Sequence, residues 1–483
     1  MLQFRSHYQF LKGIPMDAAT WEPTLDAGPL LGVAAAAIIV SLVLIIWFRI
    51  HAFLALIIVS ALTAIAAGIP LSETVGIMTD GFGGTLAPVA LLVSLGAMTG
   101  RLVEQSGGAQ SLADALVRKF GEDKAPLALG VASLMLGFPI FFDAGLIVML
   151  PTIFAVARRL DGPVLAYGIP AAGAFSVMHI YLPPHPGPVA ASEFFGADLG
   201  LVLLFGLLVA LPTWYFSGYR WGLFLGKKYP DFKVTDVLIG RETAPEEQPA
   251  QPATAGAVIS ILLIPLLLIF CTTGLTALTK TGAIDGDAGW VHLLVFLGQT
   301  PIALLITTLA AMVILGTARG IRAKEIEKSL ESAVGPVCSV MLLAGAGGMF
   351  GEVLRASGIG DALADSMAGL GIPVIVACYL TAALLRVAQG SATVALTTAA
   401  TLMVPAVEAG NFTELHVVFI VLATAAGSIF ASHVNDSGFW LIGRLMGMDV
   451  ATTLRTWTMN QVLVSVIGFA FVLLYYGIYQ LVL

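Results

Sequence analysis

The chain has 483 residues, of which 58% are hydrophobic and 11% charged, and its formal net charge is −7. Long apolar runs without strict alternation recur along it, which predicts an all-α polytopic membrane protein. The three cysteines lack CxxC spacing and no GxxxxGK[ST] loop occurs. We therefore expect no disulfide framework, no zinc site and no ATP-driven transport. We also expect no cofactor and no nucleic-acid partner.

The first half opens with a polar N-terminal tail, residues 1–27. After the tail, the sequence predicts spans at 28–48 and 50–70, a short amphipathic segment at 71–83, a span at 85–103 and a surface helix at 107–120. The apolar run that follows, 125–157, is too long for one span. At its centre, Gly137-Phe-Pro-Ile-Phe-Phe-Asp-Ala-Gly145 places a proline that breaks the helix and an Asp143 that can cap a new one. We interpret this run as a re-entrant hairpin.

The next run, 163–196, is interrupted by Pro183-Pro-His-Pro-Gly-Pro188. No continuous helix survives so many prolines, so we interpret it as a broken transmembrane helix. A span at 199–224 completes a first repeat over 28–225. The charged segment at 226–255, rich in Pro, Glu and Gln, predicts a linker.

The second half, 256–483, shows the same order of elements. Those expected are spans at 256–275, 290–316 and 333–354, surface helices at 321–332 and 358–370, a hairpin at 372–405, a broken helix at 413–440 and a last span at 457–482. The break in 413–440 falls at Ser432-His-Val-Asn-Asp-Ser-Gly438.

The second hairpin contains Leu385-Arg-Val-Ala-Gln-Gly-Ser-Ala-Thr393. A charge at the bilayer centre costs ~2.5–3.5 kcal/mol, and Gln-Gly in a helix needs partners for the freed backbone. We interpret the run as two arms that turn at 388–391. The second arm then offers free N–H groups to an anion at membrane depth. A kinked helix buried between neighbours is the alternative.

The two halves are internal repeats. Residues 100–116 align without gaps on residues 351–367, where Gly, Ser-Gly and Leu-Ala-Asp coincide. Five spans per half, with hairpins that do not cross, make the repeats inverted. When the first interspan loop is taken as cytoplasmic, most Lys and Arg residues and the central linker also fall inside. Inverted repeats with discontinuous helices at the midplane are typical of secondary transporters, and we predict one of the elevator type.

The motifs at both hairpins and both breaks, with Thr453-Leu-Arg-Thr-Trp-Thr458, resemble those of the gluconate permease family of the ion-transporter superfamily. The resemblance covers nearly the whole chain. It implies proton-coupled uptake of gluconate, or of a related sugar acid or small hydroxy acid, by a homodimer in a bacterial inner membrane. A sodium-coupled carboxylate transporter of the same superfamily is the alternative. Family members often carry Glu where this chain has Asp143, which leaves the proton carrier open.

Arg386 is the first substrate-binding candidate, because guanidinium binds carboxylates through two parallel hydrogen bonds. It can equally serve to hold the hairpin against a neighbour. The candidates around it are Gln389, Gly390, Ser391 and Thr393.

The two breaks supply further candidates. His185 can exchange protons near neutral pH, or it can bond the freed backbone. Asn435 and Ser437 can bond sugar hydroxyls. His433 and Asp436 are candidates for proton coupling, since an ionised Asp436 repels an anionic substrate. Capping of the half-helices is the alternative for Asn435 and Asp436.

Asp143 is the preferred proton carrier. It is the only acid of the first hairpin, and apolar surroundings favour its protonated form; a plain N-cap is the alternative. His179 and His416 lie in apolar spans without a motif, so we expect them to be satisfied packing residues. The chain contains no HExxH, no GxSxG at a strand-to-helix turn and no paired mid-span aspartates, which argues against an enzyme.

Overall fold

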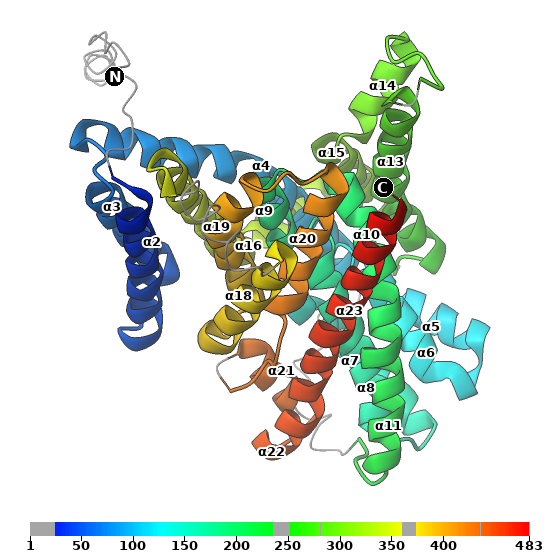
Figure 1. Ribbon diagram of the computed structural model, residues 1–483. Helices are drawn as coiled ribbons and strands as arrows, with labels where there is room; N and C mark the ends of the chain where they lie inside the picture. Colours follow the sequence, from blue (N-terminus) through cyan, green and yellow to red (C-terminus); the bar gives the residue numbers. More distant parts are fainter. Residues whose placement is uncertain (1–24, 235–251, 281, 360–372, 435, 483) are drawn as a thin grey trace.

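The computed structural model describes residues 25–234, 252–280, 282–359, 373–434 and 436–482, and within these ranges it contains helices and no strands (Figure 1). Seven helices of the described chain are long and apolar enough to span a membrane, and shorter apolar helices accompany them. The prediction of an all-α polytopic membrane protein is therefore confirmed. Much of the predicted tail, of the linker and of the surface helix at 358–370 lies outside the described residues.

The first half contains ten α-helices among the described residues. They are α2 (Ala27–Leu42), α3 (Ala52–Ala66), α4 (Leu71–Gln105), α5 (Gly108–Phe120), α6 (Ala125–Leu136), α7 (Phe142–Arg159), α8 (Val164–Tyr181), α9 (Pro186–Phe195), α10 (Leu199–Trp214) and α11 (Trp221–Lys228). The π-helical turn η3 (Tyr215–Arg220) joins α10 to α11 without a break.

The described helices of the second half are α13 (Ala255–Lys280), α14 (Gly289–Gly298), α15 (Thr300–Ala311), α16 (Ala323–Ala356), α18 (Val374–Gln389), α19 (Ala392–Glu408), α20 (Glu414–Ser428), α21 (Ser437–Leu445), α22 (Val450–Thr453) and α23 (Met459–Val482). They follow a similar order to those of the first half, except that two helices, α14 and α15, stand where the first half has α3. A π-helical turn, η6 (Leu454–Thr458), joins α22 to α23.

Two helices are longer than the sequence predicts. The amphipathic segment at 71–83 and the span at 85–103 form the single helix α4, and the surface helix at 321–332 continues into the next span as α16. Hydropathy changes at these points, but a change of hydropathy does not interrupt the backbone hydrogen bonds. Pro88 and Pro336 lie inside the two helices without ending them.

The ends of α4 and α16 have the same structure. Ser106 and Ser357 each cap a helix and donate a hydroxyl hydrogen bond to the carbonyl three residues earlier, at 2.7 and 3.0 Å. Gly107 and Gly358 follow with φ of +68° and +73°, the left-handed conformation that glycine adopts readily. The aligned residues of the two halves thus adopt matching backbone conformations, as expected for internal repeats.

Four pairs of short helices form the centre of the molecule. The helices α6 and α7 lie in the range of the first predicted hairpin, and α18 and α19 in that of the second. The other two pairs, α8 with α9 and α20 with α21, are separated by non-helical breaks. Figure 1 shows α2 and α3 on one flank of this centre and α13 and α14 on the other.

Candidate functional site

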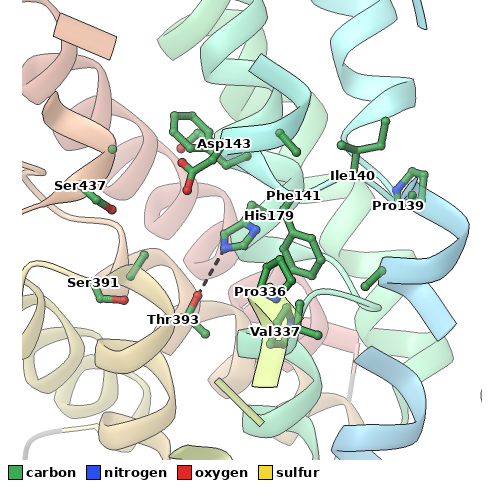
Figure 2. A pocket seen from close by; sticks show the side chains of 18 of the residues that line it. Pro139, Ile140, Phe141, Asp143, His179, Pro336, Val337, Ser391, Thr393 and Ser437 are labelled. Carbon is green, nitrogen blue, oxygen red and sulfur yellow. Dashed lines mark hydrogen bonds between the residues drawn. The ribbon is translucent and has the colours of Figure 1, made fainter. Parts of the chain in front are cut away.

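A pocket of about 570 Å³ lies where the hairpins and the broken helices meet (Figure 2). Both hairpins and both broken helices line it, and residues of the last turns of α4, of the interior of α16 and of η6 complete its wall. Its volume is within the range of small-molecule sites, ~300–1,000 Å³.

Four half-helices begin at this pocket. The lining includes the first residues of α7, α9, α19 and α21, which are Phe142, Pro186, Ala392 and Ser437. Within the described chain, the N-cap residues of α7 and α9, Phe141 and His185, form no side-chain cap hydrogen bond with the first N–H groups of these helices. Because each helix start carries a partial positive charge, four of them around one pocket favour an anion.

Arg386 lies in the last turn of α18, and its side chain is only 2% exposed. Its guanidinium donates to the Gly390 carbonyl in the hairpin turn and forms an ion pair with Asp436. Its Nε is buried and has no acceptor within the described chain. Arg386 therefore joins the second hairpin to the second broken helix, which agrees with the predicted alternative that it holds the hairpin against a neighbour. It also lines the pocket.

Asp436 is the N-cap of α21. Its carboxylate accepts the Gly438 N–H at 2.9 Å, the Ser432 hydroxyl and the guanidinium of Arg386. The Ser432 hydroxyl in turn accepts the indole N–H of Trp457 at 3.2 Å. A chain of hydrogen bonds thus leads from the last membrane helix to the turn of the second hairpin.

Asp143 lies in the first turn of α7, but the N-cap of that helix is Phe141. The alternative interpretation of Asp143 as an N-cap is therefore wrong. Figure 2 shows its carboxylate directed into the pocket between Ser437 and His179. Its side chain forms no hydrogen bond or ion pair with the described residues. The carboxyl group of Asp143 therefore faces the pocket without a partner among the described residues.

Two histidines lie between the hairpins. His185 Nε2 is 2.8 Å from the Gly137 carbonyl of the first hairpin. His179 Nε2 is 3.3 Å from the Thr393 hydroxyl of the second (Figure 2). The two rings lie 4.8 Å apart. The expectation of a satisfied packing residue is wrong for His179, because its ring lines the pocket and its Nδ1 lacks a partner in the described chain.

His416 is a satisfied packing residue, as expected. Its two ring nitrogens form hydrogen bonds with Thr413 and Gln480, and the ring lies outside the pocket.

Several predicted site residues do not line the pocket. His185 is buried behind it, and Gly390 contributes a carbonyl to Arg386. The amide of Gln389 is buried without a hydrogen-bond partner in the part of the chain that is described. His433 Nε2 lies 3.1 Å from the Val387 carbonyl. Asn435 lies outside the described residues. Of the predicted set, the pocket brings together Asp143, Arg386, Ser391, Thr393, Asp436 and Ser437.

The sequence interpretation missed several lining residues. Ser176 donates to Gln461 at 2.9 Å, and both line the pocket. Trp457 packs on Phe142 with ring centroids 5.5 Å apart. Arg101 and Glu104 of α4 also line the pocket and pair at 2.9 Å. The polar Asn-Gln pair at 460–461, inside an apolar span, is the sequence signal that could have identified α23 as part of the site.

A buried arginine, paired short helices and discontinuous helices around one central pocket are typical of secondary membrane transporters. The chain belongs to the family described as GntP family permease, whose family model matches residues 29–478. The predicted family is therefore confirmed. Its members are permeases, so the protein is a transporter and not an enzyme.

The relatives extend over almost the whole chain. A gluconate permease of Pseudomonas aeruginosa is 36% identical over 437 residues, which cover 90% of this chain and 94% of that protein. A gluconate permease of Bacillus subtilis is 36% identical and covers 92% of this chain and 98% of its own. Among solved structures, the YdaH transporter of Alcanivorax borkumensis has a similar fold, with a TM-score of 0.57, 14% identity and coverage of 85% and 90% of the two chains.

Proposed function

We propose that the protein imports gluconate, or a closely related sugar acid, together with protons across a bacterial inner membrane. The observation that carries this proposal is the convergence of four half-helix starts and Arg386 on one pocket of about 570 Å³. This arrangement suits a small anion. The names of the relatives as gluconate permeases support gluconate as that anion, and they lend no support to the sodium-coupled alternative.

The substrate carboxylate binds at Arg386 and the helix starts. The hydroxyl groups of Ser391, Thr393 and Ser437 line the same pocket and are suited to bond the hydroxyl groups of a sugar acid. Asn435 remains a proposed contact. His185 and His433 do not line the pocket; they support it through hydrogen bonds with the Gly137 and Val387 carbonyls. Gln389 and Gly390 shape the turn that holds Arg386.

Proton coupling follows from electrostatics. A monoanion that enters alone works against an inside-negative potential at ~2.3 kcal/mol per charge per 100 mV. One accompanying proton makes the step electroneutral, so that a pH gradient can drive accumulation. The carrier must be a group that titrates in the pocket beside the substrate. Asp143 and Asp436 are the two central carboxylates that qualify.

We further propose a division of labour within the repeats 28–225 and 256–483. The hairpins and broken helices form a transport body that moves as in an elevator. The flanking helices α2, α3 and α13 to α15 form a scaffold and the interface of a homodimer. The linker at 226–255 lies in the cytoplasm, as the distribution of Lys and Arg indicates.

Uptake of labelled gluconate into proteoliposomes tests the proposed function. With the interior alkaline, gluconate should accumulate above its external concentration, and a proton ionophore should abolish the accumulation. An inward sodium gradient at equal pH is the control and should drive none. Accumulation that follows sodium and ignores the pH gradient would refute proton coupling, and the absence of any gluconate flux would refute the substrate.

A further inference from the structure

The central cation of the pocket has no free face for a substrate in this conformation. Arg386 lines the pocket, yet its side chain is only 2% exposed. One terminal nitrogen donates to the Gly390 carbonyl and the other to the carboxylate of Asp436. The remaining nitrogen, Nε, is buried without an acceptor in the described part of the chain. A substrate carboxylate can reach the guanidinium only if one of these partners withdraws.

Asp436 is the partner that can withdraw. The Gly390 carbonyl belongs to the backbone of the turn that carries Arg386, so its contact is fixed by the fold. The carboxylate of Asp436 has other donors, the Gly438 N–H and the Ser432 hydroxyl, which remain when Arg386 leaves. Its contact with Arg386 depends on charge, and a proton removes that charge.

We propose that Asp436 competes with the substrate for Arg386, and that a proton taken up by Asp436 releases Arg386 to the substrate carboxylate. This inference rests on the proposed function and assigns its coupling step. The proton comes from the aqueous phase and forms an O–H bond on Asp436. The ion pair between Arg386 and Asp436 is lost, and one between Arg386 and the substrate replaces it. Proton and anion therefore enter the site together.

The charges around Asp436 agree with one proton per anion. The charged groups that line the pocket are Arg101, Glu104, Asp143, Arg386 and Asp436, and the titratable ring beside them is that of His179. Arg101 pairs with Glu104 at 2.9 Å. With every carboxyl group ionised, these two arginines and three acids carry a formal charge of −1, to which the substrate adds −1. The proton on Asp436 restores the initial charge.

Asp143 does not offer the same exchange. It faces the pocket, but it forms no ion pair with any described residue. Its protonation weakens repulsion of the anion without freeing a cation for it. His433, on the same break as Asp436, points its Nε2 at the Val387 carbonyl and does not face the ion pair. The contacts of the two carboxylates thus favour Asp436 as the coupling residue, whereas the sequence analysis prefers Asp143.

The test is gluconate binding by purified protein, measured by calorimetry in buffers of different ionisation enthalpy. This measurement yields both the Kd and the protons taken up per gluconate bound. Wild-type protein should take up about one proton per gluconate bound, and its Kd should rise by about tenfold per pH unit over the pH range in which binding takes up this proton. The variant Asp436→Asn carries no charge and retains an N-cap side chain. It should take up no proton, and its Kd should change less than about twofold over the same pH range.

Asp449→Asn is the matched control, because Asp449 also caps a helix, α22, through the Thr452 N–H at 2.8 Å, and lies outside the pocket. It should bind gluconate and protons like the wild type. Asp436→Glu keeps a carboxylate and should keep proton uptake. It serves as the second variant if Asp436→Asn does not fold, and loss of proton uptake in Asp436→Glu would then contradict the proposal.

The outcomes distinguish this inference from the proposed function. Proton uptake that persists in Asp436→Asn, or that disappears in Asp143→Asn alone, would overturn the inference and leave proton-coupled transport standing. Gluconate binding by the wild type without proton uptake would overturn both the coupling and the inference. The absence of gluconate binding at every pH would overturn the proposed function and the inference with it.

Discussion

At the scale of the residue, Arg386 contacts Gly390 and Asp436 through two different terminal nitrogens, and the single ammonium nitrogen of lysine does not reproduce this planar arrangement. We predict that Arg386→Lys weakens gluconate binding by about 10–100-fold. The reason is that hydrogen bonds to charged groups contribute ~1.5–3 kcal/mol. Equilibrium binding to purified protein measures the effect, and thermal unfolding shows whether the variant is folded.

Arg355→Lys is the control for this substitution. Arg355 pairs with Glu352 and Glu408, and its side chain is 53% exposed and lies outside the pocket. Exposed ion pairs contribute only ~0–1 kcal/mol, so gluconate binding should not change. If Arg386→Lys binds gluconate as tightly as Arg355→Lys does, Arg386 has a structural role only.

Trp457 supports the ion pair from the last membrane helix. It is 2% exposed, packs on Phe142 and donates its indole N–H to Ser432. Trp457→Phe retains the ring contact but removes the donor, and we predict a loss of ~1 kcal/mol in the free energy of unfolding. Chemical denaturation measures it. Trp47→Phe is the control, because Trp47 is 82% exposed and should change little; an equal loss in both variants would contradict the role of this hydrogen bond.

The sequence identified Arg386 and Asp436 separately but not their pairing. The two residues are 50 positions apart, and the contact exists only because a hairpin turn and a helix break meet at one pocket. The sequence prediction for His179 is wrong for the same reason. Its apolar sequence neighbours predict packing, whereas its pocket position depends on Thr393, which is 214 positions away. A contact between two residues that lie far apart in the sequence cannot be predicted from the neighbours of either residue.

At the scale of the element, α4 and α16 cross closely because glycines lie at the crossing. A Cβ atom on Gly81 would come within 2.5 Å of both the Gly348 carbonyl oxygen and the Glu352 Cβ. We predict that Gly81→Ala destabilises the protein by ~1–3 kcal/mol, the typical cost of overpacking. Thermal or denaturant unfolding of the purified variant measures this loss.

Gly76→Ala in the same helix is the control. No atom of the described residues lies within 4 Å of a Cβ atom added at Gly76, so alanine should be neutral or stabilise the helix by ~0.5–1 kcal/mol. Equal stability of the two variants would show that α4 and α16 do not approach as closely as the structure indicates.

The hairpins and breaks could be predicted from sequence because glycine and proline act locally. Gly390 adopts φ of +82° at the hairpin turn, a conformation that favours glycine, and Pro186 begins α9 where its missing N–H is harmless. The lengths of α4 and α16 could not be predicted in this way. The sequence predicts their ends where hydropathy changes, but a change of hydropathy leaves the backbone hydrogen bonds of a helix intact.

At the scale of the whole molecule, the flanking helices expose apolar faces. On α3, exposed Leu54, Ile58, Leu62 and Ile65 recur at helical spacing. On α14, Trp290, Leu293 and Phe296 do the same. Such faces suit lipid or a second copy of the chain. They agree with a scaffold on the outside and a transport body, built from hairpins and broken helices, at the centre.

The proposed elevator movement requires the second hairpin to slide along the scaffold. Ala34 of α2 and Leu402 of α19 line one small cavity of about 140 Å³ between them. We predict that cysteines at these two positions, with Cys271, Cys338 and Cys378 replaced, crosslink and abolish gluconate accumulation in proteoliposomes, and that a reductant restores it. Each single-cysteine variant, treated alike, is the control and should transport. A crosslinked protein that accumulates gluconate at the wild-type rate would exclude movement between α2 and α19, and with it this assignment of scaffold and transport body.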